Sequence, residues 1–279
     1  MEAENTGGVS PSWPVEGIVA EGSSTSWTGD RWSHKSLLAL HLGLSVAAPG
    51  IGEWMGQRVR TSPVIYVDFN GSIESFCHRA VAVAEGLGLD SRSPTLGDFH
   101  YLGRLPPGGP LSSVDALARA ARGCERIGAG LVIIEWLGAV LGFGSGGSSL
   151  GGGHRPRGGA WDRAAGLLSP LKASGAGLLL VDPLVGSHGS AAALPRALYG
   201  SEHMAGSFRV RWTDDEGKGL LGSGRGVVTL THEKNDHGPL LGDLRVRVAF
   251  GGDFPAPVRL RPERSWVRAG EAPSGAVRS

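Results

Sequence analysis

The chain has 279 residues, 41% of them hydrophobic, which suits one large α/β domain with a substantial core. Its formal net charge of +1 excludes a basic field over the whole molecule, so nucleic-acid binding would need a local basic loop. The start of the sequence has no secretory-signal pattern, and no apolar run approaches the ~20 residues that a membrane span needs. We therefore expect a cytoplasmic protein with no membrane contact.

Predicted strands and helices alternate through the first two thirds of the chain. Short runs rich in Val, Ile and Leu predict buried strands, and apolar residues at spacings of three and four predict helices. In chain order these are a strand over 23–29, a helix over 35–48, a strand over 62–70, a helix over 72–87, a strand over 98–105, a helix over 111–128, a strand over 130–136, a helix over 160–175 and a strand over 177–183. Pro170 is expected to bend or end the last of these helices.

The last third of the chain has a different pattern. From Ser207 onwards the runs SFRVRW, GVVTLTHEKN and DLRVRVAF alternate apolar and polar residues, which predicts an antiparallel meander with one solvated face. The glycine-rich segment 142–159 is expected to be a flexible loop. We expect one domain over 16–252, between a flexible leader (1–15) and a disordered tail (253–279).

The order of these elements predicts the fold class. Strands that alternate with helices imply a mostly parallel central sheet flanked by helices, here with an antiparallel β extension at its C-terminal end. Ligands of such sheets bind beyond the carboxyl ends of the strands. Polar clusters follow four of the predicted strands, at Gly29–Ser36, Asp68–Asn70, Glu135 and Asp182. We therefore expect the functional site at this edge of the sheet.

The segment between the first strand and the first helix has the layout of a phosphate-binding loop. Such a loop carries a glycine, four residues, a second glycine, a lysine and a Ser or Thr. Gly29, Lys35 and Ser36 stand at these spacings, but His34 replaces the second glycine. A lysine at a helix start is unexpected from the helix dipole, and a bound anion would explain it. The residues leave two interpretations open. One is an ordinary capping turn, and the other is a phosphate site made of Gly29, Asp30, Arg31, Trp32, Ser33, His34, Lys35 and Ser36.

The stretch from about Glu16 to Phe250 resembles the RecA-like P-loop ATPases related to the plasmid RepA-type hexameric replicative helicases. The resemblance rests on EGSSTSWTGDRWSHKSLLALHLGLSVAA, GQRVRTSPVIYVDFNG, LVIIEWLGAVLG, GLLLVDPLVGSHGS, RALYGSEHMAGSFRVRW and EKNDHGPL, which follow in the family's order and spacing. It implies a RecA-like P-loop NTPase fold with ATP and Mg²⁺ as ligands. Lys35 would contact the β- and γ-phosphates, and Ser36 with Glu135 would hold the metal.

The resemblance also implies catalytic positions, several of which carry unexpected residues. Asn70 stands where the family has a glutamate that activates the attacking water, and an amide cannot accept the proton. Asp182 occupies the position of the polar sensor of the γ-phosphate. Lys234 matches the lysine that reaches the neighbouring subunit's site, while Asp236 stands in place of an arginine. Glu74 is a candidate substitute base, and a solvated helix acid is the alternative.

The implied function is an ATP-binding, ring-forming protein linked to DNA replication or maintenance of a mobile element, with hydrolysis weak or lost. The alternative is a non-hydrolysing pseudo-ATPase that acts as a structural or regulatory subunit, in a homo-oligomer or in a hetero-oligomer with an active paralogue. Arg155 and Arg157 make the glycine-rich loop a candidate DNA contact, and a merely solvated linker is the other interpretation.

Overall fold

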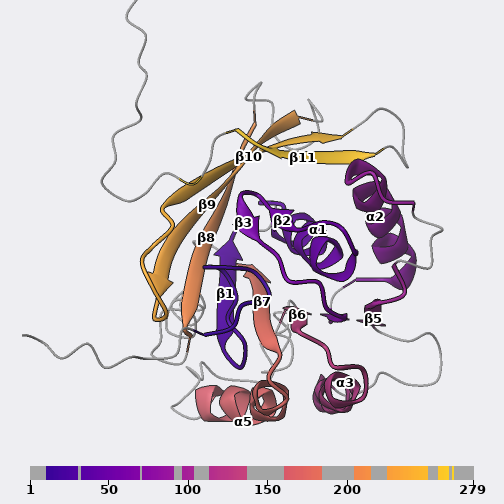
Figure 1. Ribbon diagram of the computed structural model, residues 1–279, viewed down its shortest axis with the longest axis vertical. Helices are drawn as coiled ribbons and strands as arrows, with labels where there is room; N and C mark the ends of the chain where they lie inside the picture. Colours follow the sequence, from indigo (N-terminus) through magenta and orange to yellow (C-terminus); the bar gives the residue numbers. More distant parts are fainter. Residues whose placement is uncertain are drawn as a thin grey trace, which may run out of the picture.

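The computed structural model describes residues 11–30, 33–69, 71–90, 96–103, 113–136, 160–183, 204–214, 225–250, 257–263 and 266. Its centre is a nine-stranded sheet in the order β11-β10-β9-β8-β1-β7-β6-β4-β5 (Figure 1). The strands are β1 (Ser24–Gly29), β4 (Val64–Asp68), β5 (Phe99–Gly103), β6 (Leu131–Glu135), β7 (Gly177–Pro183), β8 (Gly206–Asp214), β9 (Arg225–Asn235), β10 (Asp243–Phe250) and β11 (Val258–Pro262). The helices are α1 (Lys35–Ala47), α2 (Ile73–Gly86), α3 (Ser113–Ile127) and α5 (Ala160–Ala173), and β2 (Glu53–Trp54) pairs with β3 (Gln57–Arg58).

The sheet has a parallel and an antiparallel half. β5, β4, β6, β7, β1 and β8 pair in parallel, whereas β8, β9, β10 and β11 pair antiparallel. β1 lies between β7 and β8, so its carboxyl end sits in the middle of the sheet. This architecture confirms the predicted fold class, including the antiparallel extension.

Two hydrophobic clusters cover the two faces of the sheet. Strand residues alternate between the faces, so Leu179 and Val181 pack with α1, whereas Leu178 and Leu180 pack with α3 and α5. Figure 1 shows α1 and α2 on one side of the sheet and α3 and α5 on the other. Consequently, a polar side chain at a strand end points to α1 or to α5 according to its place in this alternation.

Helix α1 is enclosed by the curvature of the sheet. The strands β8 to β11 bend over it toward α2 (Figure 1), and their apolar side chains belong to the same cluster as those of α1. The approach of β11 to α2 is close, because a Cβ built on Gly86 would lie 1.8 Å from the Val258 carbonyl oxygen. Twelve of the thirteen residues of α1 are buried, which accounts for the apolar residues on all sides of this helix.

The predicted elements are all present, with differences at particular residues. Pro170 does not end α5, which continues to Ala173. Val114 shares the helical spacing of Leu117 and Ala121, which are buried, but is itself 51% exposed near the start of α3. No described helix is long and apolar enough to cross a membrane.

Two of the predicted domain boundaries need correction. The segment 253–279 was predicted as a disordered tail, but it supplies β11, and Trp266 Nε1 donates a hydrogen bond to the Met55 carbonyl oxygen at 3.1 Å. The leader over 1–15 ends too late, because Val15 is fully buried and bridges to Val59. Both short segments were missed because few of their residues are apolar, and the partners that bury them are distant in sequence. The glycine-rich segment 142–159 lies outside the described residues.

Candidate functional site

The candidate phosphate loop joins the last residue of β1 to the first residue of α1. Gly29 ends β1 opposite Val210 of β8, and a Cβ atom at Gly29 would lie 2.0 Å from the Val210 carbonyl oxygen. A real Cβ never comes this close to backbone, so the pairing of β1 with β8 requires glycine here. The first glycine of the motif is thus fixed by strand packing.

His34, at the position of the second glycine of such a loop, takes a left-handed backbone conformation that glycine adopts without strain. Its φ of 58° and ψ of 24° are left-handed, and its carbonyl oxygen accepts the hydrogen bond from the Leu38 amide that opens α1. The ring packs against Trp212 and Phe250, with centroids 4.4 Å and 5.4 Å away. Burial, with Lys35 nearby, lowers the pKa of His34 to about 4, so the ring is neutral at pH 7.

The start of α1 favours the phosphate interpretation over an ordinary capping turn. An ordinary turn places a side-chain oxygen on the free amides of the first turn. His34 makes no such hydrogen bond, and the first turn of α1 contains no acidic residue. The amide groups at this buried helix end therefore suit an anion that approaches along the helix axis.

The Lys35 side chain forms hydrogen bonds with residues at both ends of the loop. Its Nζ donates hydrogen bonds to the carbonyl oxygens of Gly29 at 2.8 Å and Asp30 at 2.6 Å, and to Ser33 Oγ at 3.0 Å. Burial lowers the pKa of Lys35 to about 8, although Asp30, Asp182 and Glu135 oppose this shift. The ammonium group is therefore held at the loop, in a setting where a further negative charge would stabilise it.

Ser36 and Glu135 come together from α1 and β6. Glu135 ends β6 on the face that packs with α1, and the Ser36 hydroxyl is hydrogen-bonded to its carboxylate. Burial and the nearby Asp68 raise the pKa of Glu135, and Ser36 partly offsets that rise. The structure thus places the two predicted metal ligands side by side, next to Lys35.

Asp68 lies beside Ser36 and Glu135, but its contacts hold the chain that follows β4. It lies opposite Glu135 in the register of β4 and β6, and its side chain is 1% exposed. Its Oδ1 accepts the Gly71 amide at 2.7 Å, and its Oδ2 lies 3.7 Å from Arg79 Nη2. The Tyr101 hydroxyl also donates to Oδ2, at 3.4 Å. These contacts fix the turn that leads from β4 to α2.

Asp182 is the penultimate residue of β7 and lies on the opposite face of the sheet from Glu135. It follows the alternation of Leu178 and Leu180, which pack with α5, and it pairs with Thr28 of β1. Its side chain is 3% exposed, and its charge still reaches Lys35, whose pKa it raises. Asp182 is therefore a neighbour of the phosphate loop rather than a partner of Ser36.

The remaining predicted site residues lie elsewhere. Glu74 is exposed in the first turn of α2, where hydrogen bonds from the backbone and from Ser72 lower the pKa of its carboxylate. Lys234 donates to the Met204 carbonyl oxygen at 2.6 Å and forms an ion pair with Asp236 at 3.0 Å. Asn70, Arg31 and Trp32 lie outside the described residues.

The register shows how far Lys234 is from the loop of its own chain. Lys234 lies opposite Ser207 of β8, which aligns with Ser26 of β1, three residues before Gly29. At ~3.3 Å per residue, this is ~10 Å from the level of the loop, toward the amino end of the sheet. A role for Lys234 in a neighbouring subunit stays a prediction.

Mg²⁺ fits the residues that are present. It prefers oxygen ligands, and it is usually held by one or two protein groups together with waters and substrate phosphates. Ser36 and Glu135 offer one hydroxyl and one carboxylate beside Lys35. Among the described residues, no group of three or more His, Cys, Asp or Glu could form a separate metal cage. When bound, Mg²⁺ would supply charge neutralisation for the phosphates at this point.

Sequence reasoning missed several aromatic residues around the site. Trp212 and Phe250 lie near the ends of β8 and β10, and both pack against His34. These three residues are distant in sequence, and the curvature of the sheet brings them together. Tyr66 lies under Glu135, and burial together with the charge of Glu135 raises its pKa. Tyr66 could have been found from the sequence, because it lies two residues before Asp68 in one strand and so shares its face.

Trp136, directly after Glu135, is a further residue that the sequence did not mark. Its φ of 64° is a left-handed conformation that is rare for a bulky side chain, and its amide donates to the Val181 carbonyl oxygen at 2.8 Å. Such strained backbone is often found at functional sites. Here it stands directly after the candidate magnesium ligand Glu135.

Comparison with known proteins agrees with this geometry. A search of curated proteins found no match. A family model described as an AAA domain matches residues 3–149, more than half of the 279-residue chain, and this range includes the phosphate loop, β4 and β6. The chain therefore belongs to the AAA domain family of P-loop ATPases, within the RecA-like superfamily.

Proposed function

We propose that this protein is the ATP-binding subunit of a RepA-like ring, linked to DNA replication or to the maintenance of a mobile element, and that it hydrolyses ATP weakly or not at all. The family supports nucleotide binding by the chain. The observation that carries the proposal is the convergence of Lys35, Ser36 and Glu135 at the uncapped end of α1.

Each of these residues has a distinct part in the proposed site. Lys35 meets the negative charge of the phosphates, and the first amides of α1 donate hydrogen bonds to their oxygens. Ser36 and Glu135 hold Mg²⁺. His34 is neutral, so it adds no charge and instead packs the loop against Trp212.

The weak hydrolysis follows from the missing proton acceptor. Asn70 stands where the resemblance places a glutamate, and the lowered pKa of the exposed Glu74 makes it a poorer base. Losing a general base typically lowers the rate by ~10²–10⁴-fold. We therefore expect turnover at least about a hundredfold slower than in an ATPase with an intact base.

The test is calorimetric titration of the full chain with Mg²⁺ and ATP, repeated with Lys35→Ala. We expect binding by the native chain and at least about a tenfold loss in the variant, since Lys35 is the loop's buried cation. Lys172→Ala is the matched control, because Lys172 lies in the last turn of α5, at the amino edge of the sheet. Absence of heat up to millimolar ATP from the native chain would overturn the proposal.

The same titration should depend on pH through Lys35. In the free protein the pKa of Lys35 is about 8, and a bound phosphate stabilises the protonated form. The protein must therefore take up a proton to bind ATP once the pH exceeds about 8, and the affinity should fall as the pH rises from about 7 to about 9. Lys35→Ala should remove this dependence.

The second candidate function is a non-hydrolysing structural or regulatory subunit, in a ring of identical chains or with an active paralogue. It is favoured by the ion pair between Lys234 and Asp236. Lys234 is the residue expected to reach a neighbouring subunit's site, and here its ammonium group contacts an acidic side chain of its own chain instead. Hydrolysis assays with and without DNA distinguish the two. Measurable turnover that DNA stimulates supports a slow ATPase, whereas binding without any turnover supports the pseudo-ATPase. DNA contact through Arg155 and Arg157 stays a prediction from composition.

A further inference from the structure

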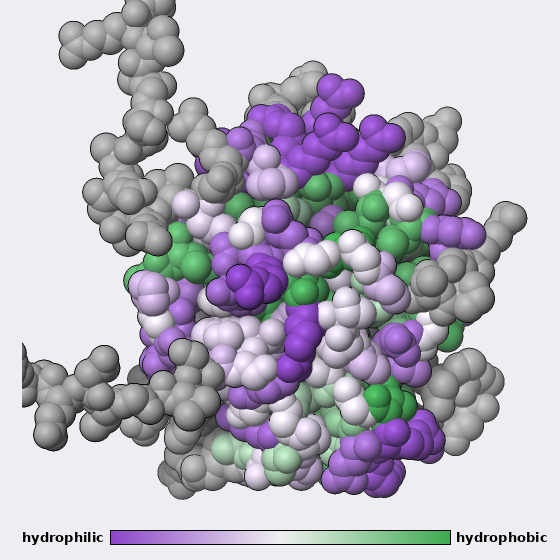
Figure 2. All heavy atoms as spheres, in the orientation of Figure 1, coloured by the Kyte–Doolittle hydropathy of each residue, from purple (hydrophilic) through white to green (hydrophobic). Residues whose placement is uncertain are grey.

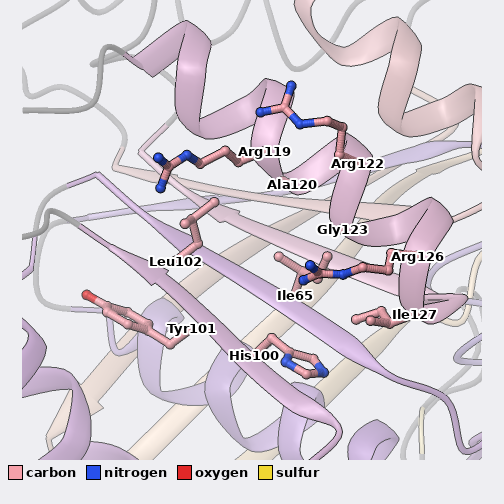
Figure 3. Close-up of a pocket in the computed structure, with 10 residues that line it drawn as sticks. All are labelled: Ile65, His100, Tyr101, Leu102, Arg119, Ala120, Arg122, Gly123, Arg126 and Ile127. Carbon is pink, nitrogen blue, oxygen red and sulfur yellow. The ribbon is translucent and has the colours of Figure 1, made fainter.

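A groove of about 550 Å³ lies on the face of the sheet opposite the candidate phosphate site (Figure 3). It runs between the edge strand β5 and the helix α3. Its floor is apolar and consists of Ile65, Leu102 and Ile127. Ile65 and Leu102 belong to the cluster that packs with α3, whereas Glu135 and Ser36 lie on the α1 side. The groove is therefore a separate feature, not an extension of the nucleotide site.

Three arginines of α3 form one wall of the groove. Arg119, Arg122 and Arg126 are spaced three and four residues apart, so they lie along one face of the helix. All three are exposed, and no hydrogen bond or ion pair joins them to any residue that the structure describes. Figure 3 shows their side chains along the length of α3, and His100 lies across the groove on β5. In Figure 2, hydrophilic residues gather in the region where Figure 1 places α3.

None of the described residues that line the groove is acidic, so the groove suits an anionic occupant. The stripe from Arg119 to Arg126 extends over seven residue steps of the helix, ~10 Å at 1.5 Å per residue. Residues on one face of an extended peptide recur every ~6.8 Å. Two successive acidic side chains on one face of such a peptide therefore fit within reach of the stripe.

The opposite wall distinguishes a peptide from a nucleic acid. β5 is the last strand of the described sheet, and β4 is the one described strand that pairs with it, so its outer edge can accept an extended chain as a further strand. Single-stranded nucleic acid is bound through aromatic stacking platforms. The Tyr101 ring is turned to the other face, where it stacks on Phe76 with centroids 3.9 Å apart. The floor instead offers Ile65 and Leu102 to aliphatic stems.

We propose that the groove between β5 and α3 binds an extended acidic peptide segment of a partner protein. The peptide lies along the outer edge of β5 as an added strand. Its acidic side chains meet Arg119, Arg122 and Arg126, and their methylene groups cover Ile65 and Leu102. The site does not depend on bound nucleotide, so this proposal can fail while the proposed function holds.

The test measures fluorescence anisotropy of a labelled short peptide of alternating Glu and Thr with the full chain at low salt. We expect binding that Arg122→Ala with Arg126→Ala weakens about tenfold, since two exposed ion pairs are lost. The matched control is Arg259→Ala with Arg261→Ala, which removes the same charge from β11 at the opposite edge of the sheet. The control should bind like the native chain.

Two further probes decide between the occupants. A peptide of equal charge with proline in place of threonine lacks half of the amide donors, and it should bind more weakly if the strand edge takes part. A thymidine oligonucleotide of similar charge tests the phosphate alternative. The proposal is overturned if the oligonucleotide binds through Arg122 and Arg126 and the peptide does not. It is equally overturned if both double variants lose the peptide alike, or if the native chain binds neither probe.

Discussion

At the scale of single residues, the candidate phosphate loop has a histidine in a left-handed conformation where such a loop normally has its second glycine. His34 holds a φ of 58°, which costs an L-residue ~1–2 kcal/mol relative to glycine. Its ring recovers part of this by packing on Trp212 and Phe250. However, His34 Nε2 and Trp212 Nε1 are both buried without a hydrogen-bond partner among the described residues. Ring packing, not hydrogen bonding, therefore stabilises His34 at this position.

The cost of this backbone conformation can be measured by comparing His34→Gly with His34→Ala. Both variants lose the ring, but only alanine must adopt the left-handed conformation. We expect His34→Ala to be less stable than His34→Gly by about 1 kcal/mol in urea unfolding. At Glu125, in the right-handed backbone of α3, the order should reverse, with alanine the more stable by about 1 kcal/mol. Equal stabilities of the two His34 variants would contradict the strain.

At the scale of secondary-structure elements, the site depends on how closely β1 pairs with β8. Gly29 lies against the Val210 carbonyl oxygen, and the loop that follows is tied back by Lys35 to the Gly29 and Asp30 carbonyls. Gly29 therefore takes part both in the pairing of β1 with β8 and in the hydrogen bonds that hold the loop. A shift of β1 relative to β8 would move the carbonyl oxygens that hold the ammonium group.

We expect Gly29→Ala to lower the free energy of unfolding by about 1–3 kcal/mol, because a methyl group would force the two strands apart. Nucleotide affinity should fall with it, since the loop begins at this residue. Gly166→Ala in α5 is the matched control: nothing lies within 4 Å of its added Cβ, and the helix should gain up to about 1 kcal/mol. Thermal unfolding of both variants checks this. A stable Gly29→Ala with native affinity would disprove the strand contact.

At the scale of the whole molecule, the sheet curves around α1 until its C-terminal strand reaches α2. β11 contributes the buried residues Val258 and Leu260, and Trp266 joins it to the β2–β3 hairpin through Met55. The curvature also brings the end of β10 to His34, so the antiparallel half of the sheet forms part of the site. The two faces of the sheet then carry separate features, the candidate nucleotide site toward α1 and the arginine groove toward α3.

A chain that ends at Phe250 should be less stable by about 3 kcal/mol or more, because it loses two buried aliphatic residues and leaves β10 as an open edge. A chain that ends at Trp266 keeps every described contact and serves as the control. Urea unfolding of both chains measures the difference. If the two have equal stability, β11 contributes nothing to the core.

The sequence by itself determined the order of strands and helices, the parallel and antiparallel halves and the edge at which the polar residues gather. The elements follow from local periodicity, which depends on residues close in the sequence. The position of the polar edge follows from the rule that ligands bind beyond the carboxyl ends of parallel strands. It also placed Lys35, Ser36 and Glu135 together, since all three stand next to strand ends or helix starts.

Only the tertiary structure decided which face each strand-end residue takes and which distant segments enclose it. Asp182 and Glu135 look equivalent in the sequence but point to opposite faces, because their positions differ in the alternation of buried residues. β11 and the aromatic wall of Trp212 and Phe250 depend on the curvature of the sheet. Curvature arises from packing summed over many strands, which no local pattern in the sequence records.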